Sequence, residues 1–281
     1  MKPSTIASSR KLGNAGRMRS FFRRFVRSRS LWAAVLVVAV PLSFADVKNY
    51  SLSDVKVVAV HEHTTSSFTE GYFFKGDVIC ETGGYWYESA YYEDNKPVFK
   101  LGRTIFAEGS VMLGENLFIL TYQNKLAYIY DAKTYKQKKA VQYLREGWGL
   151  TTDGKYLIAS DGSSNLYFMD TDYKVKKTLS VTEKGRVVPR INELEYIDGL
   201  IWANVFLTND IIVIDAETGV VKARIDLSLL YPEKERNKKA DVMNGVAWNA
   251  NTKTLWLTGK YWDKSFEIDV SGVMDALAKQ E

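Results

Sequence analysis

The sequence predicts an all-β fold for residues 46–281, and three observations support this prediction. Short runs rich in Val, Ile, Tyr, Phe and Trp alternate with turns of Gly, Asp and Asn, which is typical of strands. A similar unit recurs five times, at spacings of 38, 40, 45 and 51 residues. The units have room for four strands, and four-stranded units at about this spacing are typical of propeller blades. We therefore expect a five-bladed β-propeller with four-stranded blades.

The first strand of each unit begins in a similar short sequence, namely FTEGYFF, FAEGSVM, GWGLTT, NELEYI and MNGVAW. The positions taken as equivalent are Gly71, Gly109, Gly149, Leu194 and Gly245. A turn and a second strand follow, and the third strand of four units ends in an aspartate, at Asp131, Asp170, Asp215 and Asp269. Further turns then lead to a fourth strand, so each unit predicts one blade.

The two ends of the domain predict how the ring of blades closes. The fifth unit ends after its third strand, because residues 271–281 predict a short helix. The strand from Val55 to His61 precedes the first unit and can serve as the missing outer strand of the fifth. Closure of this kind removes strand edges that otherwise invite aggregation. A β-sandwich is the alternative, but its strands need not recur in sets of four.

Residues 1–45 predict an export signal or a membrane anchor in front of a propeller domain at residues 46–281. They contain nine basic residues and no acidic one, and end in an apolar run from Leu31 to Ala45. This run is shorter than the about 20 residues of a membrane-spanning helix. The small residues Ser43 and Ala45 fit a cleavage site before Asp46. We expect a periplasmic or secreted protein, with an uncleaved anchor as the alternative.

The charge of the domain argues against a nucleic-acid partner. The chain has a formal charge of +5, but without the nine basic residues of the leader the remainder has −4. Nucleic-acid binding needs a basic surface. One charged segment, residues 231–241, lengthens the spacing before the fifth unit. We expect a solvated loop there, and a loop that rims the entrance of a pocket is the alternative.

The single cysteine and the two histidines offer little for thiol or metal chemistry. Cys80 lies in the apolar run DVIC, which predicts a buried structural thiol. His61 and His63 alternate along a strand and so share a face, but no further ligands with metal-binding spacing follow. We expect neither a metal site nor a cofactor.

The starts of the five first strands predict a shared site. The first strand of each propeller blade lines the central channel, so residues at equivalent positions converge on one funnel. They are Glu70, Glu108, Trp148, Asn192 with Glu193, and Asn244. Carboxylates, an indole and amides at one opening make a candidate binding site. The alternative is structural: the polar side chains satisfy backbone groups in loops, and the indole packs between blades.

The blade sequences also resemble those of one known family in order and spacing. The matching motifs are FTEGY, FAEGS, EGWGLTTDGKYLIASDGSS, NELEYIDGLIWANV, MNGVAW and TGKYW, over about residues 54–269. They are similar to motifs of the plant-type glutaminyl-peptide cyclotransferases and their bacterial relatives. The resemblance implies a five-bladed propeller that converts N-terminal glutamine of peptides or proteins to pyroglutamate and ammonia, without zinc. We expect a monomer.

The resemblance implies a role for several residues. Glu108 in FAEG matches the glutamate expected to carry a proton from the attacking amine to the leaving nitrogen. Asn192 and Lys260 match the positions expected to stabilise the oxyanion. Trp148 matches an aromatic wall that stacks on the amide and excludes water. Asn244, at the start of the fifth first strand, is expected to contact the substrate.

Three further positions of the expected substrate site depart from the family pattern. Glu70 replaces a glutamine, and Tyr122 and Phe206 each replace a tryptophan. A second carboxylate beside Glu108 is expected to raise the pKa of one of the two. We expect Lys260 or a shared proton to compensate and the pH optimum to change. The alternative is that Glu70 binds the ammonium group of the substrate.

Two other functions remain open from the sequence. One is a non-catalytic exported propeller that binds peptides or small ligands, because one fold supports many functions. The other is a glycosidase that uses Glu70 and Glu108 as its carboxylate pair.

Overall fold

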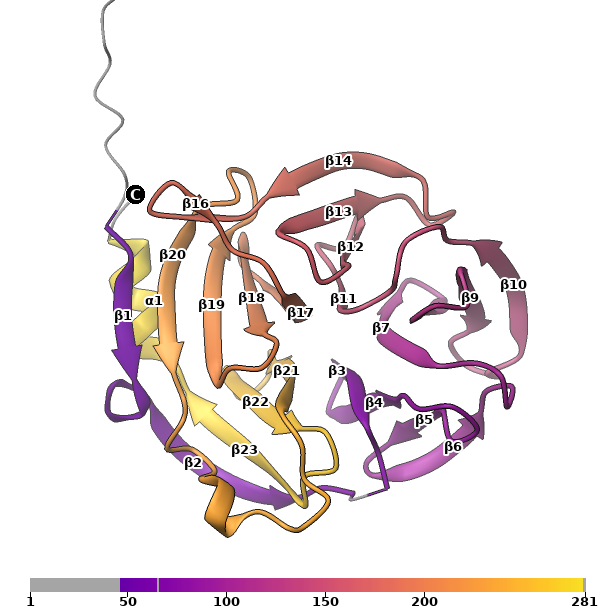
Figure 1. Ribbon diagram of the computed structural model, residues 1–281, viewed down its shortest axis with the longest axis horizontal. Helices are drawn as coiled ribbons and strands as arrows, with labels where there is room; N and C mark the ends of the chain where they lie inside the picture. Colours follow the sequence, from indigo (N-terminus) through magenta and orange to yellow (C-terminus); the bar gives the residue numbers. More distant parts are fainter. Residues whose placement is uncertain (1–45, 65, 280–281) are drawn as a thin grey trace, which may run out of the picture. The chain divides into compact units, whose positions relative to one another are not determined.

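The structure is a computed structural model that describes residues 46–64 and 66–279, and these residues form five blades around a central axis (Figure 1). Blade 1 contains β3 (Thr69–Lys75), β4 (Val78–Gly83), β5 (Ala90–Glu93) and β6 (Lys96–Lys100). Blade 2 contains β7 (Ala107–Leu113), β8 (Asn116–Thr121), β9 (Leu126–Asp131) and β10 (Gln137–Gln142). Blade 3 contains β11 (Leu150–Thr152), β12 (Leu157–Ser160), β13 (Asn165–Met169) and β14 (Val175–Ser180).

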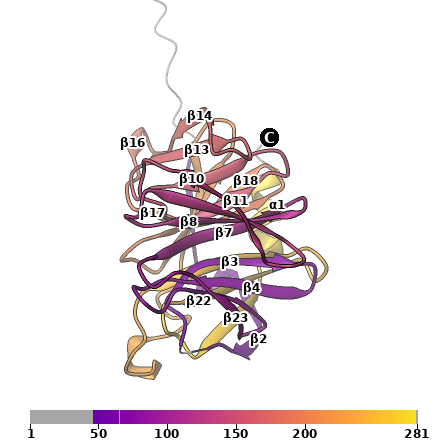
Figure 2. The same ribbon diagram turned by 90° about the vertical axis from the view of Figure 1, so that its right-hand side faces the viewer.

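Blade 4 contains β17 (Ile191–Ile197), β18 (Leu200–Val205), β19 (Asp210–Asp215) and β20 (Val221–Asp226). Blade 5 contains β21 (Met243–Asn249), β22 (Thr254–Gly259) and β23 (Lys264–Asp269). Successive strands of a blade pair antiparallel, and the first strands β3, β7, β11, β17 and β21 surround the axis, each in contact with the next. The side view shows β3 and β7 as neighbours in adjacent blades (Figure 2). The predicted five-bladed propeller is confirmed.

The ring closes as the sequence predicts. Strand β2 (Lys56–Glu62) pairs antiparallel with β23, from Lys56 opposite Asp269 to Glu62 opposite Lys264. Blade 5 therefore combines one strand from the start of the domain with three from its end. The last helix, α1 (Ser271–Ala278), is also confirmed, and it buries Val273 and Leu277.

Three further elements have no counterpart in the repeat. Strand β1 (Lys48–Ser51) pairs parallel with β20, so blade 4 has five strands among the described residues. A hairpin of β15 (Thr182–Glu183) and β16 (Arg186–Val187) lies between blades 3 and 4. The short helices are η1 (Leu52–Asp54) and η2 (Glu233–Glu235). In the part of the chain that is described, no helix is long and apolar enough to cross a membrane.

Bulges in the first strands coincide with the predicted site residues. The pairing of β3 with β4 shifts between Thr69 and Gly71, and that of β7 with β8 between Ala107 and Ser110. The same shift occurs in β17 after Ile191, and in β21 after Met243. A bulge redirects a side chain away from the regular pleat. It therefore redirects side chains at the start of four of the five first strands, whereas β11 pairs with β12 without a shift.

The glycines after these residues allow neighbouring first strands to approach closely. A Cβ atom on Gly109 would lie 2.4 Å from the backbone N of Leu150, and one on Gly149 would lie 2.1 Å from the carbonyl O of Asn192. No side chain fits there, so glycine is required by packing at the axis. Farther out, apolar clusters fill the spaces between adjacent blades.

The cysteine and the histidines have structural partners. Cys80 is fully buried, as predicted, and burial raises the pKa of its thiol to about 12. His61 Nε2 lies 3.0 Å from a carboxylate oxygen of Glu267 on β23. His63 is buried and contacts Glu81 at 3.0 Å with Nε2 and the carbonyl O of Trp262 at 2.8 Å with Nδ1. His63 therefore joins blades 1 and 5, whereas the pair of His61 and Glu267 lies within blade 5.

Candidate active site

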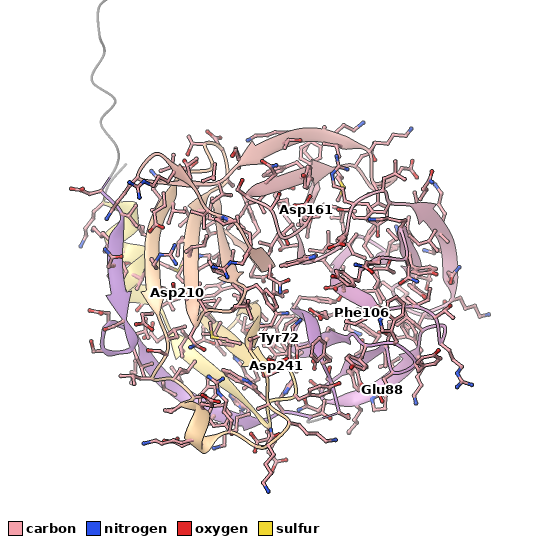
Figure 3. All side chains as sticks on the ribbon, viewed as in Figure 1. Tyr72, Glu88, Phe106, Asp161, Asp210 and Asp241 are labelled. Atoms are coloured by element: carbon pink, nitrogen blue, oxygen red, sulfur yellow. The ribbon has the colours of Figure 1, made fainter. Side chains whose placement is uncertain are left out.

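The first-strand bulges open onto a small pocket of about 160 Å³ at the axis. It is lined by Phe68, Glu70, Phe106, Glu108, Tyr122, Trp148, Asn192, Phe206 and Lys260. Seven of the eight predicted site residues are in this set, and Figure 3 marks Phe106 on the inner side of blade 2. Asn244 is buried behind the pocket, where it contacts Glu70. The convergence expected from the repeat is therefore present in the structure.

Pocket residues come from the starts of first strands and from the ends of second strands. Glu70, Glu108 and Asn192 belong to bulged first strands, while Tyr122, Phe206 and Lys260 directly follow the second strands β8, β18 and β22. In an antiparallel hairpin the start of one strand lies beside the end of the next. This geometry explains why motifs from both parts of the repeat meet in one pocket.

Glu70 is held in a buried ion pair. Its Oε1 lies 2.6 Å from Nζ of Lys260, and the two side chains are 2% and 7% exposed. Its Oε2 accepts a hydrogen bond of 3.3 Å from Nδ2 of Asn244, which also donates to the carbonyl O of Thr69 at 2.8 Å. Asn244 therefore orients Glu70 and does not line the pocket.

Glu108 is positioned to hold a proton. Burial raises its pKa well above the ordinary value, the negative charge of the neighbouring Glu70 raises it further, and the positive charge of Lys260 opposes them. Burial also raises the pKa of Glu70, against the effect of Lys260. Two buried carboxyl groups beside one ammonium group share one proton. Because Glu70 is paired with Lys260, Glu108 is the carboxyl whose pKa is raised more strongly.

Asn192 presents a polar group without a protein partner. Its side chain is 3% exposed, and among the described residues its buried Oδ1 has no hydrogen-bond partner. A buried acceptor in this condition costs about 1–3 kcal/mol. Because Asn192 lines the pocket, a ligand with an N–H group can remove this penalty.

Aromatic rings form the walls of the pocket. Trp148 and Phe206 meet edge to face at 5.5 Å between ring centroids. Lys260 Nζ lies 4.3 Å from the ring centroid of Phe68, so the cation is held between a ring and a carboxylate. The loop of the SDGSS motif supports the indole: Gly162 has φ +77°, and a Cβ there would lie 2.6 Å from the Trp148 ring. Together with Phe106 and Tyr122, these rings form aromatic walls around the polar groups of the pocket.

Two pocket residues were missed in the sequence. Phe68 and Phe106 both line the pocket, and each precedes the first-strand glutamate by two positions, in FTEG and FAEG. Their equivalence in the repeat was the signal that could have identified them. Gly84 leaves room for the Phe106 ring and the Glu70 side chain, because a Cβ atom there would lie 2.5 Å from the ring and 2.8 Å from Glu70.

One residue of the predicted funnel has only a structural role. Glu193 is fully buried, and its carboxyl oxygens accept hydrogen bonds from the backbone N–H groups of Tyr72 (3.2 Å) and Val246 (2.7 Å). It joins blade 4 to blades 1 and 5 across the axis. For this residue the structural alternative is correct, because its bulge turns it away from the pocket.

The pocket therefore combines two carboxyl groups, an ammonium group, an amide and aromatic walls. These groups can receive a small planar amide, move a proton and stabilise an oxyanion. Fold and site define a five-bladed propeller with an axial pocket whose side chains suit a small planar amide.

Comparison with known proteins identifies the family. A family model described as "Glutamine cyclotransferase" matches residues 31–270, and the chain belongs to this family. It is 34% identical over 236 residues to a glutaminyl-peptide cyclotransferase of Arabidopsis thaliana, with 78% of this chain and 72% of the relative covered. It is also similar to the crystal structure of Myxococcus xanthus glutaminyl cyclase, with a TM-score of 0.72 and 29% identity, covering 80% of this chain and 98% of the other.

Proposed function

We propose that this protein is a glutaminyl-peptide cyclotransferase that converts the N-terminal glutamine of peptides to pyroglutamate and releases ammonia. The observation that carries the proposal is the single pocket in which Glu108, Asn192 and Lys260 meet. Family membership supports the same reaction. The α-amine and the side-chain amide belong to one residue, so the pocket needs only to fold the substrate and handle its protons.

The reaction forms one C–N bond and breaks another. The α-amine attacks the side-chain amide carbon, which gives a tetrahedral centre with a negative oxygen. The protonated carboxyl of Glu108 donates its proton to the leaving nitrogen with one oxygen and accepts a proton from the attacking nitrogen with the other. Ammonia leaves, the lactam remains, and Glu108 is protonated again. Such proton transfer contributes typically about 10²- to 10⁴-fold to the rate.

The other pocket residues stabilise the charge and exclude water. Lys260, held by Glu70, and the amide N–H group of Asn192 donate to the developing oxyanion. The Asn192 Oδ1 atom accepts an N–H of the substrate amine or amide, which removes its unsatisfied state. Trp148 and Phe206 cover the flat amide. Every proton and charge step uses a side chain, so we propose an acyltransferase that works without a metal ion.

The test is ammonia release from the dipeptide Gln-Ala by purified residues 46–281. We expect release in the presence of a chelator, and a loss of about 10²-fold or more in kcat for Glu108→Gln, whose amide keeps the shape of the side chain. Peptide binding without release by the unaltered protein would instead support the non-catalytic alternative. The glycosidase alternative fits poorly, because its second carboxylate must be free to attack the sugar or to activate water, whereas Glu70 is held by Lys260 at 2.6 Å.

Location and assembly are also part of the proposal. The leader at residues 1–45 lies outside the described residues, and its sequence supports export to the periplasm or secretion, either released after cleavage or anchored. We propose a monomer with peptide or protein substrates and no nucleic-acid partner. N-terminal sequencing of the protein from cell fractions tests the cleavage before Asp46, and size-exclusion chromatography tests the monomer.

A further inference from the structure

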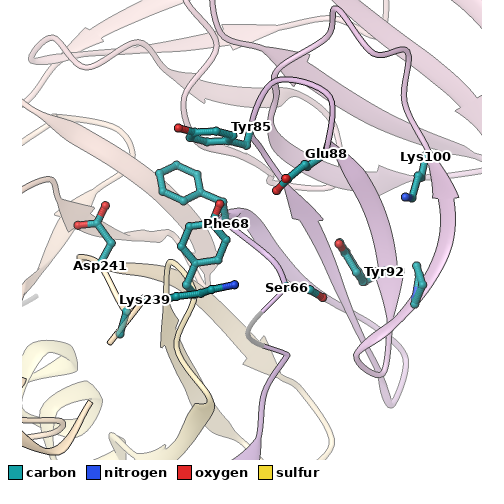
Figure 4. Close-up of a pocket in the computed structure, with 11 residues that line it drawn as sticks. Ser66, Phe68, Tyr85, Glu88, Tyr92, Lys100, Lys239 and Asp241 are labelled. Atoms are coloured by element: carbon teal, nitrogen blue, oxygen red, sulfur yellow. The ribbon is translucent and has the colours of Figure 1, made fainter. Parts of the chain in front are cut away.

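The axial pocket is too small for more than the glutamine residue. Its volume of about 160 Å³ is below the about 300–1,000 Å³ that is usual for a ligand pocket. The rest of a peptide substrate must lie outside it. A larger groove of about 870 Å³ lies next to it, and Phe68 lines both (Figure 4). The groove therefore continues directly from the place where the glutamine binds.

The groove lies between two loops. One loop joins β4 to β5 and contributes Tyr85 and Glu88, and the other precedes β21 and contributes residues 239–241. Tyr92 and Lys100 lie toward the outer strand of blade 1 (Figure 4). The charged segment at residues 231–241 thus borders this entrance, which agrees with the alternative that the sequence left open.

The loop after β4 holds an aromatic ring in a costly backbone conformation. Tyr85 has φ +96°, which is rare for a residue with a Cβ atom, and its side chain is 48% exposed. The loop is nevertheless fixed, because the carbonyl O of Tyr85 accepts a hydrogen bond of 2.8 Å from the Ser89 hydroxyl. The ring packs against Phe68 at 5.6 Å and Phe106 at 6.1 Å between centroids. Strain of this kind concentrates at ligand-binding sites.

The charges of the groove are available to a ligand. Glu88, Lys100, Lys239 and Asp241 all line it. None of them belongs to a salt bridge within residues 46–64 and 66–279. Aromatic rings beside charged groups of both signs suit a polypeptide, which presents apolar side chains together with polar backbone groups.

We propose that this groove binds the peptide segment that follows the N-terminal glutamine, and that Tyr85 is a specificity-determining residue for longer peptides. The inference rests on the proposed cyclotransferase function and deepens it: the substrate class is peptides with an extended N-terminus. The glutamine enters the axial pocket past Phe68, and the following residues lie against the Tyr85 ring. The groove then contributes mainly to the KM for peptides.

The test compares glutaminamide with the pentapeptide Gln-Ala-Ala-Ala-Ala as substrates of two variants. Tyr85→Gly removes the ring and suits the positive φ, so the fold is preserved. Tyr87→Gly is the matched control, because Tyr87 also has a positive φ of 70° and is 66% exposed but does not line the groove.

For Tyr85→Gly we expect kcat/KM for the pentapeptide to fall about 3- to 10-fold through KM, the range of one aromatic contact, and less than about twofold for glutaminamide. Tyr87→Gly should leave both values near those of the unaltered protein. Equal losses on both substrates, or no loss on the pentapeptide, would overturn the groove assignment alone. No ammonia from either substrate with unaltered protein would instead overturn the cyclotransferase function.

Discussion

The pocket contains three ionisable side chains whose charges depend on one another. The carboxylate of Glu70 pairs with Lys260 at 2.6 Å. The same carboxylate raises the pKa of Glu108, after burial, which is the largest cause. A carboxylate at position 70 therefore raises the proton affinity of Glu108, which an amide of nearly the same shape would not do.

The first prediction concerns the pH dependence of the reaction. Glu70→Gln removes a negative charge that raises the pKa of Glu108, so that pKa falls. Protonated Glu108 is then lost at a lower pH, and the alkaline limb of the kcat profile moves to lower pH. The measurement is kcat for Gln-Ala against pH for both proteins. Superimposable profiles would show that Glu70 does not control Glu108.

At the scale of the element, short loops hold the site residues in place. The loop with the SDGSS motif approaches Trp148 so closely that position 162 has no space for a side chain. The strand bulges and the close glycines at the axis act in the same way for Glu108 and Asn192. The site depends on backbone geometry as much as on the catalytic side chains.

The second prediction tests this dependence with two glycines of blade 3. Gly162→Ala displaces the Trp148 ring, and a misplacement of this size can cost up to about 10²-fold, so we expect kcat/KM to fall about tenfold or more. Gly154→Ala is the control: its φ of +84° causes similar backbone strain, but nothing lies within 4 Å of the added Cβ. Equal activity of the two variants would exclude a positioning role for the loop.

The third prediction concerns the buried pair at the junction of blades 1 and 5. Glu81→Gln leaves His63 without its carboxylate, and breaking a buried pair typically costs about 3–5 kcal/mol in the free energy of unfolding. Glu267→Gln breaks the more exposed pair with His61, and we expect less than about 1 kcal/mol. Urea unfolding at pH 7 measures both values. Similar losses would contradict the role of burial.

The fourth prediction is the pH dependence of this stability difference. Burial alone lowers the pKa of His63, but Glu81 more than offsets it and the net pKa is raised. The contribution of His63 is therefore complete below its unfolded pKa of about 6.5 and is lost as the pH rises through the folded value. Burial alone raises the pKa of Glu81, but His63 more than offsets it and the net pKa is lowered. The contribution of Glu81 to the free energy of unfolding is therefore complete above its unfolded pKa and is lost as the pH falls through the folded value.

The gap in unfolding free energy between the unaltered protein and Glu81→Gln should consequently narrow toward alkaline pH and toward strongly acidic pH. Urea titrations across this range measure it. A gap that is constant with pH would show that the pair contributes through packing and not through charge.

At the scale of the whole molecule, closure depends on one strand. Strand β2 covers β23 and joins the two ends of the domain. The fifth prediction is that residues 63–281 aggregate, because the edge of β23 is left unpaired. Residues 52–281, which lack only β1, should remain monomeric and active. Size-exclusion chromatography and activity on Gln-Ala measure the outcome, and a monomeric, active protein of residues 63–281 would show that β2 is dispensable.

The repeat was sufficient to predict the number of blades, their first strands and the closing strand. The recurring unit places equivalent residues such as Glu70 and Glu108 at the same level of the axis, and seven of the eight predicted residues meet in the pocket. Strand β1 was not predicted, because pairing at the edge of blade 4 leaves no trace in the periodicity. Asn244 was placed in the pocket by its motif but turns to support Glu70.

By itself, the sequence determined the architecture and the chemical types gathered at the axis, since strand patterns and repeat spacing are local properties of the chain. Only the tertiary structure decided which groups share a proton, which carboxylate pairs with Lys260 and which amide is left unsatisfied. Those properties depend on burial and on distances between blades that no single motif encodes. The groove beside the pocket was likewise decided only by the tertiary structure, because loops of blade 1 and residues 239–241 meet only in the closed ring.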